Sequence, residues 1–335
     1  MKQSQYMKRT AASPYPDTQS LLAVLESLFR CSGAVSVLNR QPIIPAMTFP
    51  TEIVTFSMDR KRALKLFCKY EAGRNHNAFG HRGGLAYETE VYRLVLAPLK
   101  STTSKFFGAW KSAAGDNTWL VLEYLEDAKL LRDLHLDVNT EPQPTEMGLA
   151  ARWIGNFHAA NQARVATGRL PFLNRYGPSY YAGWARRTCE FAGTLNRQSP
   201  ALARVCQQSG ELLAPLLAAQ PTVIHGEYYE NNILLRERTV CPADWESAAI
   251  GPGEIDLAAL TDGAWAAELV RQSEEEYLRA RWPGGAPDTF RPALAAARLY
   301  LHFRWLGEQP AWTTHLNSRW RVQGLVAAAK RLRLA

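Results

Sequence analysis

Short stretches in which apolar and polar residues alternate dominate the first part of the chain. Such alternation over about four to eight residues predicts half-buried β-strands. Turn residues separate the stretches, and the tight turn at 59–62 predicts a hairpin between the second and third strands. We therefore predict a small antiparallel sheet of five strands, at 34–38, 52–58, 63–68, 105–110 and 118–123.

Helical periodicity marks the segment before this sheet and most of the chain after it. Asp17 is a candidate N-cap for a helix that ends at Gly33, and another helix begins at Tyr87. Further helices are predicted at 149–160, 180–195, 202–219 and past 256. We expect an α+β protein with a disordered leader at 1–16, an N-terminal lobe at 17–123 and a larger, mainly helical C-terminal lobe at 124–335.

A crowded polar loop at 225–232 lies between two short apolar runs. Val223-Ile224 enters the loop and Ile233-Leu234-Leu235 leaves it, which predicts strand, loop, strand. Functional polar groups are often held on loops between rigid elements. Twelve residues after Asn232, Asp244 ends another strand-like run. An amide and a carboxylate brought together by adjacent strands form a good oxygen-ligand pair for Mg²⁺.

Lys65 lies among apolar neighbours in the third predicted strand, and Glu88 lies at the start of the helix that begins at Tyr87. An ammonium group there needs an anionic partner unless it reaches water at the edge of the sheet. A glutamate in a first helical turn is also explained by the helix dipole. However, a strand lysine followed by a helix glutamate is the arrangement that positions ATP phosphates in kinase-type enzymes. The two residues alone leave these alternatives open.

Composition limits the partners that we expect. The chain has 335 residues, of which 47% are hydrophobic, and this suffices for two lobes with filled cores. The net charge of +8 comes from scattered basic residues, so we expect no nucleic-acid partner. No continuous apolar run of about 18 residues occurs, so we expect no membrane span. Five cysteines without CxxC spacing indicate reduced, mostly buried thiols in a cytoplasmic protein, namely Cys31, Cys68, Cys189, Cys206 and Cys241.

Aromatic residues are frequent near the end of the chain. They either fill a core, as is usual for aromatics at helical spacing, or line a substrate pocket. They are Trp265, Tyr277, Trp282, Tyr300, Trp305, Trp312 and Trp320. His158, on the apolar side of the helix at 149–160, is interpreted as a buried, hydrogen-bonded histidine.

A compound motif extends over about thirty residues of the C-terminal half. It consists of His225-Gly226-Glu227 followed after four residues by Asn232, then Asp244-Trp245-Glu246, then Gly251 and Asp256-Leu257-Ala258. Together with the preceding strand lysine and helix glutamate, this order resembles the aminoglycoside phosphotransferase and choline kinase branch of the protein-kinase-like superfamily. The resemblance implies a two-lobed protein-kinase-like fold and ATP-dependent phosphoryl transfer to a hydroxyl group of a small molecule.

The resemblance also implies roles for individual residues. Asn232 and Asp244 would hold Mg²⁺ and act in catalysis, while His225 would pack the loop and Asp256 would brace it through backbone N–H groups. Lys65 would contact the α- and β-phosphates of ATP, oriented by Glu88. The residues expected to bind the nucleotide are Lys65, Glu88 and, in the hinge at 123–127, Glu123 and Leu125.

Two positions depart from the family pattern. Glu227 stands where the family has the aspartate that accepts the proton of the attacking hydroxyl. One extra methylene moves the carboxylate by roughly an ångström, and misplacement on that scale costs about a hundredfold in rate. We predict an active kinase with a glutamate base, and the alternative is an impaired pseudokinase or nucleotide-binding module.

Between the first two strands, residues 39–51 contain no G-x-G-x-x-G, which favours a phosphotransferase over a protein kinase.

The identity of the acceptor is only weakly constrained by charge. Residues 261–335 contain seven Asp or Glu against eleven Lys or Arg. This balance favours a neutral or anionic hydroxylated compound over a polycationic antibiotic.

Overall fold

The computed structural model describes residues 13–30, 35–44, 48–58, 62–71, 79–80, 83–99, 102–115, 117–135, 144–310 and 319–334. The chain divides into two compact units. The first comprises 1–75, 84–89 and 104–126, and the second comprises 76–83, 90–103 and 127–335. Most of the predicted leader lies outside the described residues. The first unit contains an antiparallel sheet and the second is mainly helical, which confirms the α+β prediction.

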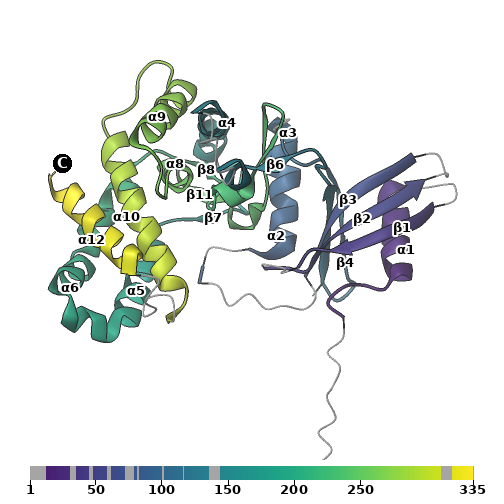
Figure 1. The fold of residues 1–335 in the computed structure, drawn as a ribbon, viewed down its shortest axis with the longest axis horizontal. Helices are drawn as coiled ribbons and strands as arrows, with labels where there is room; N and C mark the ends of the chain where they lie inside the picture. Colours follow the sequence, from purple (N-terminus) through teal and green to yellow (C-terminus); the bar gives the residue numbers. More distant parts are fainter. Residues whose placement is uncertain are drawn as a thin grey trace, which may run out of the picture. The chain divides into compact units, whose positions relative to one another are not determined.

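The first unit is built around a five-stranded antiparallel sheet with the order β1-β2-β3-β5-β4 (Figure 1). Its strands are β1 (Val35–Pro42), β2 (Thr51–Met58), β3 (Arg62–Tyr70), β4 (Phe106–Lys111) and β5 (Thr118–Glu123). The five strands and the antiparallel pairing of β2 with β3 confirm the predicted sheet and its hairpin. Alternation along the strands creates one apolar face, which α1 (Thr18–Phe29) covers.

The helix α1 begins where the sequence indicates. Asp17 caps it, because Oδ1 of Asp17 accepts a hydrogen bond from the backbone N of Ser20 at 2.9 Å. The helix ends earlier than predicted, since Arg30 adopts a left-handed conformation. The next helix begins at Gly84 and not at Tyr87. It comprises α2 (Gly84–Glu90), the π-helix η1 (Val91–Leu96) and α3 (Ala97–Leu99).

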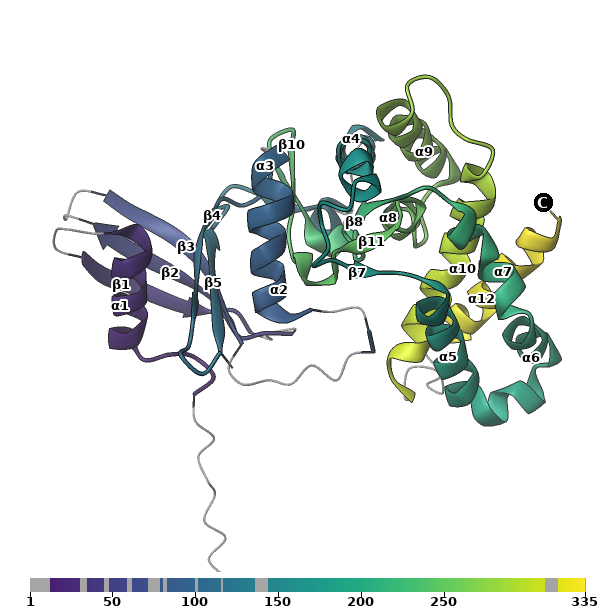
Figure 2. The same ribbon diagram turned by 180° about the vertical axis from the view of Figure 1, so that it is seen from behind.

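The second unit is organised around α10 (Phe290–Glu308). This helix packs against α5 (Pro178–Gln198), α7 (Ser209–Ala218), α8 (Glu254–Leu260) and α12 (Arg319–Leu334), as Figure 2 shows. A second pair is formed by α4 (Pro144–Ala166) and α9 (Ala267–Arg281). The single helix predicted at 202–219 is wrong, because α6 (Pro200–Gln207) and α7 are separated at Gln208. No helix within the described ranges is long and apolar enough to cross a membrane.

Two small sheets of the second unit hold the polar loop. One has the order β7-β11-β8 and the other β10-β9-β6. The elements are β6 (Lys129–Leu130), β7 (Asn174–Arg175), β8 (Pro221–Ile224), β9 (Ile233–Arg236), β10 (Thr239–Pro242) and β11 (Ala249–Pro252), with the 3₁₀ turns η2 (Leu131–His135), η3 (Glu230–Asn232) and η4 (Trp245–Ser247). Strand β8 enters the loop and β9 leaves it, which confirms the predicted pattern. The β9–β10 hairpin then returns the chain to the end of the loop.

The cysteine prediction is wrong for one pair. Cys189 on α5 and Cys206 on α6 form a disulfide, with their Cα atoms 5.8 Å apart. The packing of α5 against α6 brings these side chains together, and no local spacing in the sequence marks that contact. Cys68 and Cys241 are buried thiols, and burial raises the pKa of Cys68 to about 12. Cys31 lies outside the described residues.

Candidate active site

Asp256, on α8, supports the backbone of the loop that follows β8. Its carboxylate accepts hydrogen bonds from the backbone N of His225 at 2.6 Å and of Gly226 at 2.9 Å. The ring Nε2 of His158, on α4, lies 3.0 Å from the same carboxylate. Burial lowers the pKa of His158 to about 4, so the ring is neutral near pH 7 and donates through Nε2. His158 is thus a buried, hydrogen-bonded histidine, and Asp256 braces the loop from below through two N–H groups.

The first two residues of the loop shape its turn. Gly226 has a φ of +83°, and a Cβ at this position would lie 2.3 Å from the carbonyl oxygen of Ser247, so only glycine fits. The ring Nε2 of His225 lies 2.9 Å from the carbonyl oxygen of Ala243 and donates to it. His225 therefore ties the loop to the chain just beyond β10.

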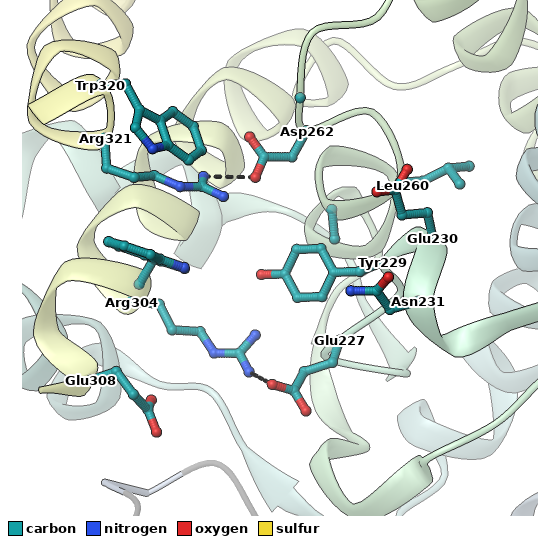
Figure 3. Close-up of a pocket in the computed structure, with 13 residues that line it drawn as sticks. Glu227, Tyr229, Glu230, Asn231, Leu260, Asp262, Arg304, Glu308, Trp320 and Arg321 are labelled. Atoms are coloured by element: carbon teal, nitrogen blue, oxygen red, sulfur yellow. Dashed lines mark hydrogen bonds and ion pairs between the residues drawn. The ribbon is translucent and has the colours of Figure 1, made fainter. Parts of the chain in front are cut away.

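Glu227 projects from this turn with both carboxylate oxygens engaged. The hydroxyl of Ser247 donates to Oε2 at 2.9 Å, and Nη2 of Arg304 donates to Oε1. Arg304 also donates through Nη1 to the carbonyl oxygen of Gly226 at 2.7 Å. Figure 3 shows the Arg304 side chain reaching from α10 to Glu227. The carboxylate is therefore held by groups from two different elements.

Asn232 and Asp244 are brought together at the end of the loop. The side-chain Nδ2 of Asn232 donates to the carbonyl oxygen of Glu227 at 3.0 Å, which orients the amide. The backbone N of Ala243 donates to the carbonyl oxygen of Asn232 at 2.9 Å, so Asp244 follows directly. Asp244 has the left-handed conformation φ 66°, ψ 66°, which is uncommon for a residue other than glycine. Strain of this kind is often found at functional sites.

A cavity of about 430 Å³ in the second unit is lined by Glu227 and its surroundings (Figure 3). Two ion pairs form part of the wall, Glu227 with Arg304 and Asp262 with Arg321, the latter at 2.7 Å. The other lining residues are Tyr229, Glu230, Asn231, Ala259, Leu260, Gly263, Trp305, Glu308 and Trp320. Four carboxylates against two guanidinium groups give the lining a formal charge of −2. The excess of basic residues in 261–335 therefore does not predict the charge of this cavity's lining.

Of the aromatic residues near the end of the chain, some fill the core and others line the cavity, which are the two alternatives that the sequence left open. Tyr277 and Tyr300 are fully buried in the second unit. Trp305 and Trp320 instead line the cavity, and the guanidinium of Arg321 lies 4.2 Å from the ring centre of Trp320. Trp312 lies outside the described residues.

The first unit contains a buried ion pair between β3 and α2. Nζ of Lys69 lies 2.7 Å from Oε2 of Glu88, and both side chains are almost completely removed from solvent. Lys65, four residues earlier on β3, is half-exposed and forms an ion pair with Glu126. A buried charge requires a partner, whereas an exposed lysine does not. The structure therefore pairs Glu88 with Lys69 and not with Lys65.

A family model described as the phosphotransferase enzyme family matches residues 95–300, which is more than half of the chain. The chain belongs to the phosphotransferase enzyme family. The matched residues include the braced loop, Asn232, Asp244 and Asp256, and they confirm the family that the sequence motif resembles. A search of curated proteins finds no match.

Solved structures share the fold of this family member along almost its whole length. A choline/ethanolamine kinase family protein from Mesorhizobium loti is 16% identical with a TM-score of 0.55, covering 95% of this chain and 94% of that one. Choline kinase from Cryptosporidium parvum is 13% identical with a TM-score of 0.62, covering 95% and 96%. Aminoglycoside 2′-phosphotransferase-IIIa is 11% identical with a TM-score of 0.63, covering 94% and 99%. These likenesses confirm the predicted protein-kinase-like fold.

One expectation for this phosphotransferase needs correction. The prediction that Glu88 orients Lys65 is wrong, because Lys69 occupies the buried position opposite Glu88. The two lysines lie on the same face of β3, since side chains repeat every two residues along a strand. Only the position of α2 along the strand decides between them. No local signal in the sequence separates them, because Leu64 and Leu66 flank Lys65 just as Cys68 and Tyr70 flank Lys69.

The hinge residues lie where β5 ends. The backbone N of Glu123 donates to the carbonyl oxygen of Lys105 at 2.8 Å, and its side chain accepts from the N of Lys105 at 3.2 Å. Leu125 is buried. Nucleotide contacts for these two residues remain a prediction.

Sequence reasoning missed the two residues that hold the Glu227 carboxylate. Ser247 lies three residues beyond Asp244, in η4, and Arg304 lies on α10, 77 residues beyond Glu227. Ser247 directly follows the Asp244-Trp245-Glu246 motif, which was a usable signal. Arg304 had none, because it is one of many arginines on the C-terminal helices.

Proposed function

We propose that this protein is an ATP- and Mg²⁺-dependent phosphotransferase that acts on a hydroxyl group of a small molecule, with Glu227 as the general base. One observation carries the proposal. The Glu227 carboxylate is held at the wall of a cavity, on a loop that also presents Asn232 next to Asp244. This cavity is the candidate acceptor pocket.

Phosphoryl transfer depends mainly on positioning and on the neutralisation of charge. As the acceptor oxygen bonds to the γ-phosphorus and the bond to the leaving ADP breaks, Glu227 accepts the proton of the hydroxyl group. His225 and Asp256 keep the loop in place through their hydrogen bonds. Misplacement of the base by about 1 Å costs roughly a hundredfold in rate, so this support matters.

Asn232 and Asp244 would hold the Mg²⁺. Asn232 uses its Nδ2 to bind the carbonyl oxygen of Glu227, so the opposite side of the amide presents Oδ1, an oxygen donor of the kind that Mg²⁺ prefers. Within the described ranges, no cluster of three or more His, Cys, Asp or Glu could hold a metal by itself. This fits a site made of one amide, one carboxylate and substrate phosphates. Neutralisation of the transferring phosphoryl group is the chemistry that Mg²⁺ supplies when bound.

Lys69, oriented by Glu88, is the lysine that we propose to contact the nucleotide phosphates. Their buried ion pair has the strand-lysine and helix-glutamate arrangement of kinase-type enzymes. Solved structures of similar fold include complexes with ADP, GDP and AMP, which supports the use of a nucleotide.

The test is ADP release with Mg·ATP and a library of hydroxylated amines, sugars and alcohols. The wild type should release ADP above background with at least one acceptor, and Asp244→Ala and Glu227→Gln should abolish this. Asp288→Ala removes an exposed carboxylate from the same unit and should leave turnover unchanged. Turnover that survives Asp244→Ala would remove the assignment.

A second candidate function is nucleotide binding without phosphoryl transfer. The ion pair between Glu227 and Arg304 favours it, because a carboxylate stabilised by a cation is a weaker base. Calorimetry would then detect Mg²⁺-dependent ATP binding, while no acceptor in the library would be phosphorylated.

A further inference from the structure

Arg304 is a charged residue buried in the second unit, with only 5% of its surface exposed. A guanidinium group that leaves water is costly unless its N–H groups are paired. Nη1 donates to the carbonyl oxygen of Gly226 at 2.7 Å, and Nη2 donates to Oε1 of Glu227. The planar fork of arginine can reach both acceptors at once, whereas a lysine ammonium is a single point charge. Arg304 therefore contacts both the backbone and the carboxylate of the catalytic loop.

The histidine and tyrosines around Glu227 and Arg304 are uncharged near pH 7, so Arg304 is the cation that faces the Glu227 carboxylate. The groups that interact electrostatically with one or both partners include His225, Tyr229, Tyr176, Tyr180 and Tyr300, with Asp244 and Asp256 near His225. Burial lowers the pKa of His225 and raises the pKa values of the four tyrosines, so all five are uncharged near pH 7. Burial alone would lower the pKa of Arg304, but Glu227 and Tyr229 raise it well above its ordinary value. Arg304 is thus a cation near pH 7.

The length of Glu227 explains why such a partner matters. A glutamate has one more rotatable bond than the aspartate of the family pattern, so its carboxylate has more positions to adopt. Ser247 fixes Oε2 and Arg304 fixes Oε1. These two contacts hold the carboxylate in one position.

We propose that Arg304 is a positioning residue: it holds the longer Glu227 side chain in one place, where the carboxylate can accept the proton of the acceptor. The proposal rests on the proposed phosphotransferase function for its catalytic consequence, but the contact itself does not depend on that function. This positioning role differs from that of an arginine that binds a substrate anion in the cavity.

The first experiment measures kcat and KM for Arg304→Met and Arg304→Lys, with Mg·ATP and the best acceptor of the library. For Arg304→Met we expect kcat to fall about a hundredfold while KM stays within about twofold. Arg304→Lys retains a charged donor but not the planar fork, so its kcat should be intermediate.

Arg298→Met is the matched control. Arg298 lies on the same helix and forms an ion pair with Glu274 at 2.7 Å, away from the loop. Its kcat and KM should match those of the wild type. A rise in KM for Arg304→Met with an unchanged kcat would show that Arg304 binds substrate, and the positioning role would be refuted.

The second experiment needs no turnover. Thermal melting temperatures are compared for the wild type, Arg304→Met, Glu227→Gln and the double variant. If Arg304 fixes Glu227, the double variant loses less stability than the sum of the single losses. Additive losses would overturn the proposal. A wild type that phosphorylates no acceptor refutes the proposed function, while this cycle still decides whether Arg304 holds Glu227.

Discussion

Replacing Lys69 by methionine should destabilise the protein far more than the same change at Lys65. Lys69 and Glu88 are both buried, with 2.7 Å between Nζ and Oε2. Loss of the ammonium group leaves the Glu88 carboxylate in a desolvated site without this cation, which typically costs about 3–5 kcal/mol. Lys65 and Glu126 form an exposed pair, for which about 0–1 kcal/mol is typical. For a chain of this size, the Lys69 variant should melt at a temperature lower by roughly five degrees.

Thermal melting of Lys69→Met and Lys65→Met, with the wild type alongside, tests this difference. Lys65→Met is a close control, because both lysines lie on the same face of β3 and undergo the same substitution. Titration with Mg·ATP during melting adds a functional measurement, in which only Lys69→Met should lose the stabilisation by nucleotide. Equal melting temperatures for the two variants, or a larger loss for Lys65→Met, would refute the assignment of Lys69 as the partner of Glu88.

Three further changes probe the support of the loop and the disulfide. Burial lowers the pKa of His158 from 6.5 to about 4, so between these values the unfolded chain binds a proton that the folded chain does not, and stability falls as the pH falls. His158→Gln should reduce the change in the free energy of unfolding over this pH range by roughly 3 kcal/mol. Melting temperatures from pH 4.5 to 7 that depend on pH as steeply as in the wild type would contradict this expectation. Gly226→Ala should cost about 1–3 kcal/mol or more, seen as an earlier urea midpoint, because its Cβ would lie 2.3 Å from the carbonyl oxygen of Ser247. Reduction of the bond between Cys189 and Cys206, which closes a short loop, should cost about 3 kcal/mol, and mass spectrometry of alkylated protein that finds both thiols free would disprove the bond.

The sheet and the loop could be predicted because their signals are local. Alternation over a few residues marks each strand, and the tight turn before β3 marks the hairpin. Asn232 and Asp244 are separated by one short hairpin, so their approach follows from the turn between β9 and β10. The spacing of the motif was therefore enough to predict that Asn232 and Asp244 lie close together.

The choice between Lys65 and Lys69 could not be made from periodicity. Both residues fall on the same face of β3, and the choice between them depends on where Glu88 of α2 lies along the strand. Residues 72–78 and 81–82, which precede that helix, are outside the described residues, and the length of a connection does not determine where the helix packs. Apolar neighbours do not separate the two lysines either, because Leu64 and Leu66 flank Lys65 as Cys68 and Tyr70 flank Lys69, and adjacent side chains point to the opposite face of the strand.

Contacts between residues distant in the chain account for the other differences. Arg304 and Glu227 meet because α10 packs against α8, and α8 carries the carboxylate that braces the loop. Similarly, Cys189 and Cys206 meet through the packing of two helices. The sequence contains no local pattern for either pair, because the residues around a helical side chain do not indicate which distant residue it will contact.

The loop therefore has two separable supports, and this explains how a glutamate can stand at Glu227. Asp256 fixes the backbone through the N–H groups of His225 and Gly226, and this support is independent of the side chain at 227. Arg304 and Ser247 fix the carboxylate, and their contacts require the longer side chain. A shorter aspartate would keep the backbone support but would withdraw its carboxylate from Arg304 by roughly an ångström. Restoring the aspartate of the family pattern is thus expected to weaken the site, because the surroundings of position 227 are built for glutamate.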